Sequence, residues 1–207
     1  MNTCVPNYPT TFNTNSALFF NLRRSRSIPM NSLAYALLAM LVRKPCSGYE
    51  LAKMMEVFWQ AKHSQIYPLL AKLEGGGFLT AENIEQTGKP NKKIYTITES
   101  GRAQLKSWIG KAPAHPVSRD EFLIKAYSLS LSDRGTAVRL FEDRIELYEK
   151  KLQARNLKLN SMIEEFGEQI ENPIHPAFGR YIVHRRRLHL EEQEIAWCRW
   201  VLELLEA

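Results

Sequence analysis

The sequence predicts a mainly α-helical protein with one small β-hairpin, organised as two helical parts in series. Beyond position 30, apolar residues recur at helical spacing over most of the 207-residue chain. One stretch, 78–98, alternates instead like paired strands. Proline-rich breaks at 113–116 and 172–176 divide the helices. We therefore expect a first domain over 30–112 and a helical domain over 117–207.

Three helices are expected at the start of the first domain. A helix over 31–43 ends before Pro45, because proline cannot continue the backbone hydrogen-bond ladder. A second helix begins at Ser47-Gly48, carries apolar residues from Tyr49 to Trp59, and precedes a third over 64–74. The third helix stops at three consecutive glycines, since glycine readily adopts the left-handed conformation of a helix C-terminus.

A hairpin and a fourth helix complete this domain. The segments 78–85 and 93–98 have strand-like composition, with Tyr95 and Ile97 on one face. The polar turn between them contains Gly, Pro and Lys, which predicts a hairpin with a basic tip. Thr98 is the expected N-cap of the fourth helix. The stripe that we expect this helix to bury consists of Leu105, Trp108 and Ile109.

The second domain is expected to be helical throughout. A short helix over 119–129 precedes a long helix from Ser132-Asp133, and a final helix covers 177–205. The long helix carries an apolar stripe whose spacings alternate between three and four residues, and only Arg155 interrupts it. This pattern is typical of a coiled-coil seam. A seam of this length predicts a homodimer in which the long and final helices of both subunits pack together. The stripe consists of Val138, Phe141, Ile145, Tyr148, Leu152, Leu159, Met162 and Phe166.

Charge is distributed unevenly along the chain. The net charge is +6, with 11 basic against 6 acidic residues in 30–112 but 14 against 16 in 113–207. The first domain is therefore suited to a polyanionic partner and the second is not. Residues 1–29 hold three arginines and no acid. We expect them to be a disordered extension; an upstream start codon before a natural Met30, or a minimal DNA-binding arm, are alternatives.

Several classes of function are disfavoured. The three cysteines are scattered, which predicts a reducing, cytoplasmic environment without disulfides or structural zinc. No apolar run reaches the roughly 20 residues that a membrane-spanning helix needs. The five histidines lack metal-ligand spacing, and no nucleophile, phosphate-loop or cofactor motif occurs. We therefore expect no enzyme, no metal and no cofactor.

Three helices followed by a hairpin form the winged helix-turn-helix plan, in which one helix enters the major groove of DNA. The runs SGYEL at 47–51, FWQAKHSQIYPLLAKLE at 58–74 and KKIYTITESG at 92–101 resemble the PadR family of regulators. The run DEFLIKAY at 120–127 resembles its longer-tailed branch, which contains phenolic-acid-responsive repressors. The resemblance implies a transcriptional repressor that acts near its own or a neighbouring promoter. The two symmetric recognition helices of the predicted homodimer should bind an inverted repeat in duplex DNA. A winged-helix module for protein–protein contact is the alternative.

The resemblance also assigns candidate DNA contacts. On the third helix Ile66, Leu69, Leu70 and Leu73 occupy the core side, so the other side faces DNA. Gln65 can read an adenine edge through paired hydrogen bonds. For Tyr67, packing against the wing is the alternative, and for His63 an ordinary exposed histidine. The candidate DNA contacts are Lys62, His63, Ser64, Gln65, Tyr67 and Lys72 on the helix, with Lys89, Lys92 and Lys93 on the wing.

An effector site is a further implication of the resemblance. In the resembling branch, aromatic acids bind between the winged domain and the helical part. The stretch 178–182 resembles part of that region, which makes Phe178, Arg180 and Tyr181 the candidate effector contacts. Arg180 stands where phenolic-acid-responsive relatives have histidine. An arginine still suits a carboxylate, which it can bind through two hydrogen bonds.

Overall fold

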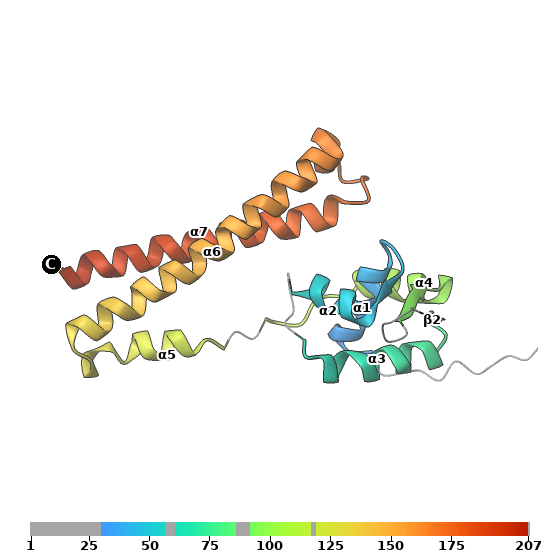
Figure 1. Cartoon of the computed structure of the whole chain (residues 1–207), viewed down its shortest axis with the longest axis horizontal. Coiled ribbons are helices and arrows are strands. Elements are labelled where there is room, and N and C mark those ends of the chain that lie inside the picture. The colour runs from blue at the N-terminus through green and yellow to red at the C-terminus, as the bar shows by residue number, and fades with distance from the viewer. Residues whose placement is uncertain (1–29, 57–60, 86–91, 117–118, 207) are drawn as a thin grey trace, which may run out of the picture.

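The computed structural model describes residues 30–56, 61–85, 92–116 and 119–206, and the predicted helices and hairpin are present (Figure 1). Phe58 and Trp59, the predicted end of the second helix, lie outside the described residues. The elements of the first domain are α1 (Ser32–Leu41), β1 (Cys46–Ser47), α2 (Gly48–Met55), α3 (His63–Gly75), β2 (Leu79–Ile84), β3 (Lys92–Ile97) and α4 (Glu99–Ile109).

The sheet has three strands rather than the two predicted. Strands β2 and β3 form the predicted antiparallel hairpin, in which Ala81 pairs with Tyr95. The two-residue strand β1 joins the other edge of β3, with Cys46 opposite Tyr95, so the strand order is β1-β3-β2. Strand β1 was not predicted because two residues are too few to show strand alternation.

The core of the winged domain is apolar. Leu37, Leu51 and Leu70 are fully buried, and each comes from a different helix. Hydroxyl caps begin two of the helices, and the cap at Thr98 was predicted from the sequence. The Ser47 hydroxyl accepts the Glu50 amide N–H of α2, and the Thr98 hydroxyl accepts an amide N–H of α4. The surrounding helices therefore hold α3 and the hairpin in fixed positions.

The predicted buried stripe of α4 is partly wrong. Leu105 is buried, but Trp108 is 37% exposed and Ile109 is 70% exposed. Trp108 lies flat on Tyr35 of α1, with ring centroids 4.5 Å apart. Because α4 packs chiefly against α1, the last turn of the helix extends beyond the apolar surface that covers Leu105.

The second domain is a long helical hairpin (Figure 1). It consists of α5 (Glu121–Tyr127), the 3₁₀ turn η1 (Leu129–Leu131), α6 (Arg134–Phe166), the 3₁₀ turn η2 (Gly167–Glu171) and α7 (Phe178–Glu206). The apolar stripe of α6 packs along α7 of the same chain. The expectation that a stripe of this length needs a second subunit is therefore wrong, because α7 has 29 residues against 33 in α6. Among the described residues, no helix combines the length and the apolar character that crossing a membrane requires.

Candidate nucleic-acid interface and effector site

Helix α3 has one buried face and one polar face, as predicted. Ile66, Leu70 and Leu73 are buried in the core of the winged domain. The candidate contacts on the opposite side all lie on the surface; these are Lys62, His63, Ser64, Gln65, Tyr67 and Lys72. The structure therefore leaves the predicted recognition surface of α3 accessible along its length.

Gln65 has a second role that the sequence pattern did not indicate. Its side-chain oxygen Oε1 accepts the backbone N–H of Lys62, the N-cap residue of α3, at 3.1 Å. This bond satisfies one of the free amides at the start of the helix. An adenine edge needs both the oxygen and the nitrogen of a glutamine amide. Reading adenine therefore requires Gln65 to share or release the bond to Lys62.

Tyr67 packs against the start of α2. A Cβ atom added at Gly48 would lie only 2.6 Å from Cε1 of the Tyr67 ring. The ring of His63 lies between Tyr67 and Tyr49, with centroid distances of 6.0 and 6.2 Å and nearly parallel planes. These three side chains, here called the aromatic stack, form a continuous exposed surface on the first turns of α2 and α3.

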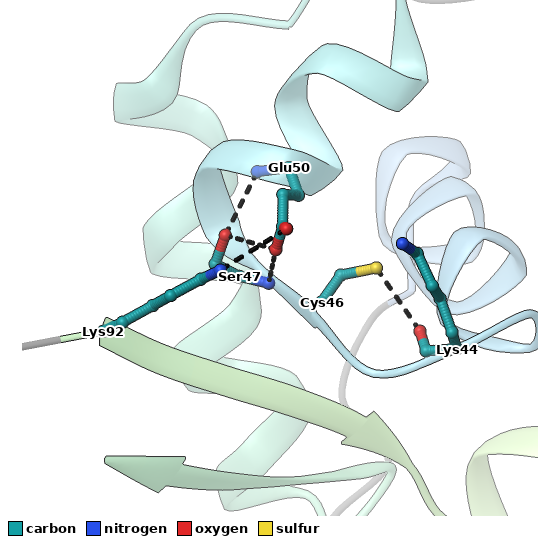
Figure 2. Close-up of polar contacts among 5 residues, drawn as sticks. All are labelled: Lys44, Cys46, Ser47, Glu50 and Lys92. Carbon is teal, nitrogen blue, oxygen red and sulfur yellow. Dashed lines mark hydrogen bonds and ion pairs between the residues drawn. The ribbon is translucent and has the colours of Figure 1, made fainter. Parts of the chain in front are cut away.

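The end of the hairpin next to the turn is held to α2 by an ion pair between Lys92 and Glu50 (Figure 2). The Glu50 carboxylate accepts the backbone N–H of Ser47 at 2.8 Å and its hydroxyl at 2.7 Å. The Lys92 ammonium lies 3.4 Å from the same carboxylate. Hydrogen bonds from Ser47, assisted by Lys92, lower the pKa of Glu50 to about 2, so this carboxylate is ionised at neutral pH.

The second wing lysine is also paired. The Lys93 ammonium donates to the Glu74 carboxylate of α3 at 2.8 Å, and this bond raises the pKa of the lysine. Lys92 and Lys93 lie at the end of the hairpin next to the turn, paired with Ile84 and Asn83 of β2, and each is next to an acid of the helix-turn-helix. Lys89, the candidate at the tip, lies outside the described residues. Together these pairs join the wing to the N-terminus of α2 and the C-terminus of α3.

Arg180 differs from the other buried arginines of the helical domain. Its side chain is 18% exposed, yet all three guanidinium nitrogens are buried and have no hydrogen-bond partner among the described residues. The nearest carboxylate oxygen, from Glu165, is 4.0 Å away, and the guanidinium lies over the Phe166 ring at 5.6 Å. Burial and the positive charge of Arg43, just beyond α1, lower the pKa of Arg180. The site is therefore short of negative charge on the side of the winged domain.

The other two candidate effector residues contribute differently. Tyr181 is buried in the hairpin core beside Leu159, and its hydroxyl donates to the Glu171 carboxylate at 2.7 Å. That donor is therefore already used within the fold. Phe178, the first residue of α7, is half-buried. Of the three candidates, Arg180 alone has unsatisfied hydrogen-bonding capacity.

Three functional candidates were missed from the sequence. Tyr49 was grouped with the apolar residues of the second helix, but it is 65% exposed. Glu50 lies beside the Lys92 ammonium, and the positive charge of Arg43 lowers the pKa of Arg180, although the members of each pair are distant in the chain. The capping pattern of Ser47 followed three residues later by Glu50 was visible in the sequence. The ion pairs that cross between elements had no local signal.

A winged helix with an exposed recognition helix, joined to a helical domain, defines the class of winged-helix DNA-binding regulators. The family model described as the transcriptional regulator PadR-like family matches residues 37–107. The model described as virulence activator alpha C-term matches residues 118–206. The chain belongs to the PadR family, which consists of transcriptional regulators and not of enzymes.

Two curated relatives match nearly their whole length. The negative transcriptional regulator PadR of Bacillus subtilis is 36% identical over 185 residues, which cover 86% of this chain and 99% of the relative. A probable transcriptional regulator of Mycobacterium tuberculosis is 32% identical over 191 residues, covering 84% and 98% of the two chains.

Solved structures of the Bacillus subtilis protein are similar in fold. Its complex with operator DNA has a TM-score of 0.73 at 34% identity and covers 86% of this chain and 99% of that one. Its complex with p-coumaric acid has a TM-score of 0.64 at 33% identity, with coverage of 84% and 99%. The chain is therefore a DNA-binding transcriptional regulator of the PadR family.

Proposed function

We propose that this regulator is a homodimeric, cytoplasmic repressor that binds an inverted-repeat operator and is released by a small aromatic carboxylate. Its relative from Bacillus subtilis is named a negative regulator and has been solved with operator DNA and with p-coumaric acid. The observation that carries the proposed release mechanism is the buried Arg180 guanidinium, which makes no hydrogen bond among the described residues.

The chemistry of Arg180 supports a carboxylate ligand. A buried cation without hydrogen-bond partners is costly, and a planar carboxylate can satisfy two of its N–H groups at once. The Phe166 ring supplies apolar surface for an aromatic body beside it. A ligand that binds one conformation more tightly shifts the protein toward it, and a hundredfold change in DNA affinity corresponds to about 2.7 kcal/mol.

The proposed DNA contacts are those of the exposed face of α3 and the wing. Gln65 reads base edges, while the remaining side chains hold phosphates. Two symmetric copies of α3 would then meet half-sites about one helical turn apart. The proposed contacts are Lys62, His63, Ser64, Gln65, Tyr67, Lys72, Lys89, Lys92 and Lys93.

Exposed apolar residues at the α5 end of the helical domain support a homodimer. Large apolar side chains rarely gather on the surface of a monomer without a partner. Leu152, in contrast, packs inside the intrachain hairpin, so replacing it would disturb the fold itself. Leu131→Glu is a cleaner test, because Leu131 is 91% exposed and its replacement should not disturb the fold. We expect this variant to be monomeric by light scattering. The exposed residues are Leu123, Ile124, Tyr127, Leu131, Trp200 and Leu204.

The release mechanism is tested on a protein–DNA complex. A duplex is first selected from a random pool by the wild-type protein, and a panel of aromatic acids is titrated into the complex. We expect at least one acid to release wild type and Arg199→Ala, an exposed arginine on the same helix, but not Arg180→Ala. Release that is unchanged in Arg180→Ala, or absent with every acid, would refute the role of Arg180. Failure to bind any duplex in a salt-dependent manner would favour the protein–protein alternative.

A further inference from the structure

Tyr49 is a large side chain held in an exposed position. It is the second residue of α2, it is 65% exposed, and it belongs to none of the apolar clusters of the described residues. Its ring is ordered by the parallel ring of His63, which in turn lies on Tyr67. Burial of apolar surface therefore does not explain this arrangement.

The position of Tyr49 in the fold places it next to the expected path of DNA. In a helix-turn-helix pair the first helix crosses the sugar–phosphate backbone while the second enters the major groove. Tyr49 lies on the first turn of α2, and its stacking partner His63 is the first residue of α3. The ring consequently stands at the boundary between the groove and the backbone that borders it.

The surrounding charges also suit a phosphate. The neighbouring carboxylate of Glu50 is engaged by Ser47 and by the Lys92 ammonium, which reduces its repulsion of an anion. Lys62 is exposed beside His63 and adds positive charge. A tyrosine hydroxyl is a common donor to phosphate oxygens in protein–DNA complexes.

We propose that Tyr49 is a DNA-backbone contact, whose hydroxyl donates to a phosphate at the edge of the groove that α3 enters. The aromatic stack with His63 and Tyr67 holds its ring in place. Tyr49 thus fixes the position of α3 on the duplex without reading a base. This inference rests on the DNA-binding mode proposed above.

The hydroxyl is tested with Tyr49→Phe, which keeps the ring and its stacking. The matched control is Tyr148→Phe, which removes the hydroxyl of a half-buried tyrosine of α6, outside both the proposed DNA contacts and the proposed dimer contact. The probes are the duplex selected by wild type from the random pool and a scrambled duplex of the same composition. We expect Tyr49→Phe to bind both duplexes about tenfold more weakly, because it removes a hydrogen bond to a charged group. The control should bind both duplexes as wild type does.

Each other outcome is decisive. Wild-type affinity of Tyr49→Phe for both duplexes would overturn the inference and favour a protein as the partner of this surface. A loss confined to the selected duplex would also overturn it, because that pattern identifies a base reader. If wild type selects no duplex at all, the proposed function itself fails and the inference fails with it.

The supporting role of the stack is tested with Gly48→Ala. The added methyl would meet the Tyr67 ring at 2.6 Å, so the ring must rotate away while the backbone of α2 stays helical. Gly75→Ala adds the same methyl where no atom lies within 4 Å. We expect Gly48→Ala to fold with unchanged helix content but to bind the selected duplex at least tenfold more weakly, and Gly75→Ala to bind normally. Equal affinity of the two variants would contradict the role of the stack.

Discussion

The two domains use ionisable residues in opposite ways. In the winged domain the buried core is apolar, and the charged side chains of Glu50, Lys92 and Lys93 lie at its margin. In the helical hairpin, by contrast, charged groups lie between the packed helices, and Glu191 and His184 are buried. The difference suggests that the winged domain keeps its charges available to a polyanion. The hairpin instead holds charges that must be satisfied from within or by a ligand.

Three arginines of the hairpin sharpen this comparison. Arg144 lies 2.5 Å from Asp120 and 2.8 Å from Glu194, and so links α5, α6 and α7. Arg155 lies 3.0 Å from Glu191, and its Nη1 is 2.9 Å from Nδ1 of His184. Of the three, Arg180 alone lacks a hydrogen-bonded partner. Substitutions of the two hydrogen-bonded arginines and of Arg180 should therefore differ in their effect on the free energy of unfolding.

Removing a paired arginine should destabilise the hairpin strongly. Arg155→Met leaves the buried carboxylate of Glu191 without its cation, and breaking such a pair costs about 3 kcal/mol in free energy of unfolding. Urea denaturation measures this loss. The double variant Arg155→Met/Glu191→Met removes both charges and should regain most of it. A single variant as stable as wild type would show that the pair does not hold the hairpin together.

His184 should make the hairpin sensitive to moderate acid. Burial and the positive charges of Arg155, Lys158 and Arg180 lower its pKa to about 4, below its ordinary value of about 6.5. Between these values the unfolded chain binds more protons than the folded one. The contribution of neutral His184 to the free energy of unfolding is therefore fully present above pH 6.5. It is lost as the pH falls toward 4, by up to about 1.4 kcal/mol per pH unit.

Unfolding measured across this pH window in two variants separates His184 from other acids and bases. His184→Gln should flatten the dependence between pH 6.5 and 4. His189→Gln, which changes an exposed histidine on the same helix, should retain the wild-type slope. Equal slopes in the two variants would assign the sensitivity to other groups.

Arg180→Met should act in the opposite direction to Arg155→Met. It removes a buried charge that has no hydrogen-bonded partner, so the free energy of unfolding should stay unchanged or rise by about 1 kcal/mol. Urea denaturation, as for Arg155→Met, measures this change in the free energy of unfolding. A decrease of about 2 kcal/mol or more would mean that Arg180 is a structural residue, satisfied within the fold.

The fold was predictable from local signals, and the charge pairing was not. Helix boundaries followed from caps such as Ser47 and Thr98, and the hairpin from its alternation and glycine-containing turn. The exposed face of α3 followed from the spacing of Ile66, Leu70 and Leu73. Helical spacing also indicated burial for Tyr49 and Ile109, which are exposed, because it does not reveal where a neighbouring element ends. The lack of hydrogen bonds at Arg180 depends on residues from three separate segments and had no signature in the sequence.

The wing lysines should affect DNA binding more than stability. Their ion pairs with Glu50 and Glu74 are partly exposed, and such pairs contribute less than about 1 kcal/mol each. Lys92→Ala/Lys93→Ala should therefore remain folded while binding all duplexes more weakly. The slope of the logarithm of affinity against the logarithm of salt concentration should decrease in magnitude by about one for each phosphate that the variant no longer binds. Lys125→Ala, which breaks an exposed pair in the helical domain, serves as the control and should leave the slope unchanged.

Whether Arg180 uses its free hydrogen-bonding capacity to bind a carboxylate is tested most directly by calorimetric titration in the absence of DNA. Aromatic carboxylates, including p-coumaric acid, and their uncharged amides are titrated into wild type, Arg180→Met and Arg199→Met. At least one acid should bind wild type and Arg199→Met with similar affinity. It should bind Arg180→Met at least tenfold more weakly, and its amide should not bind. Equal binding of that acid to Arg180→Met, or no binding of any acid to wild type, would contradict the assignment of Arg180 as the carboxylate site.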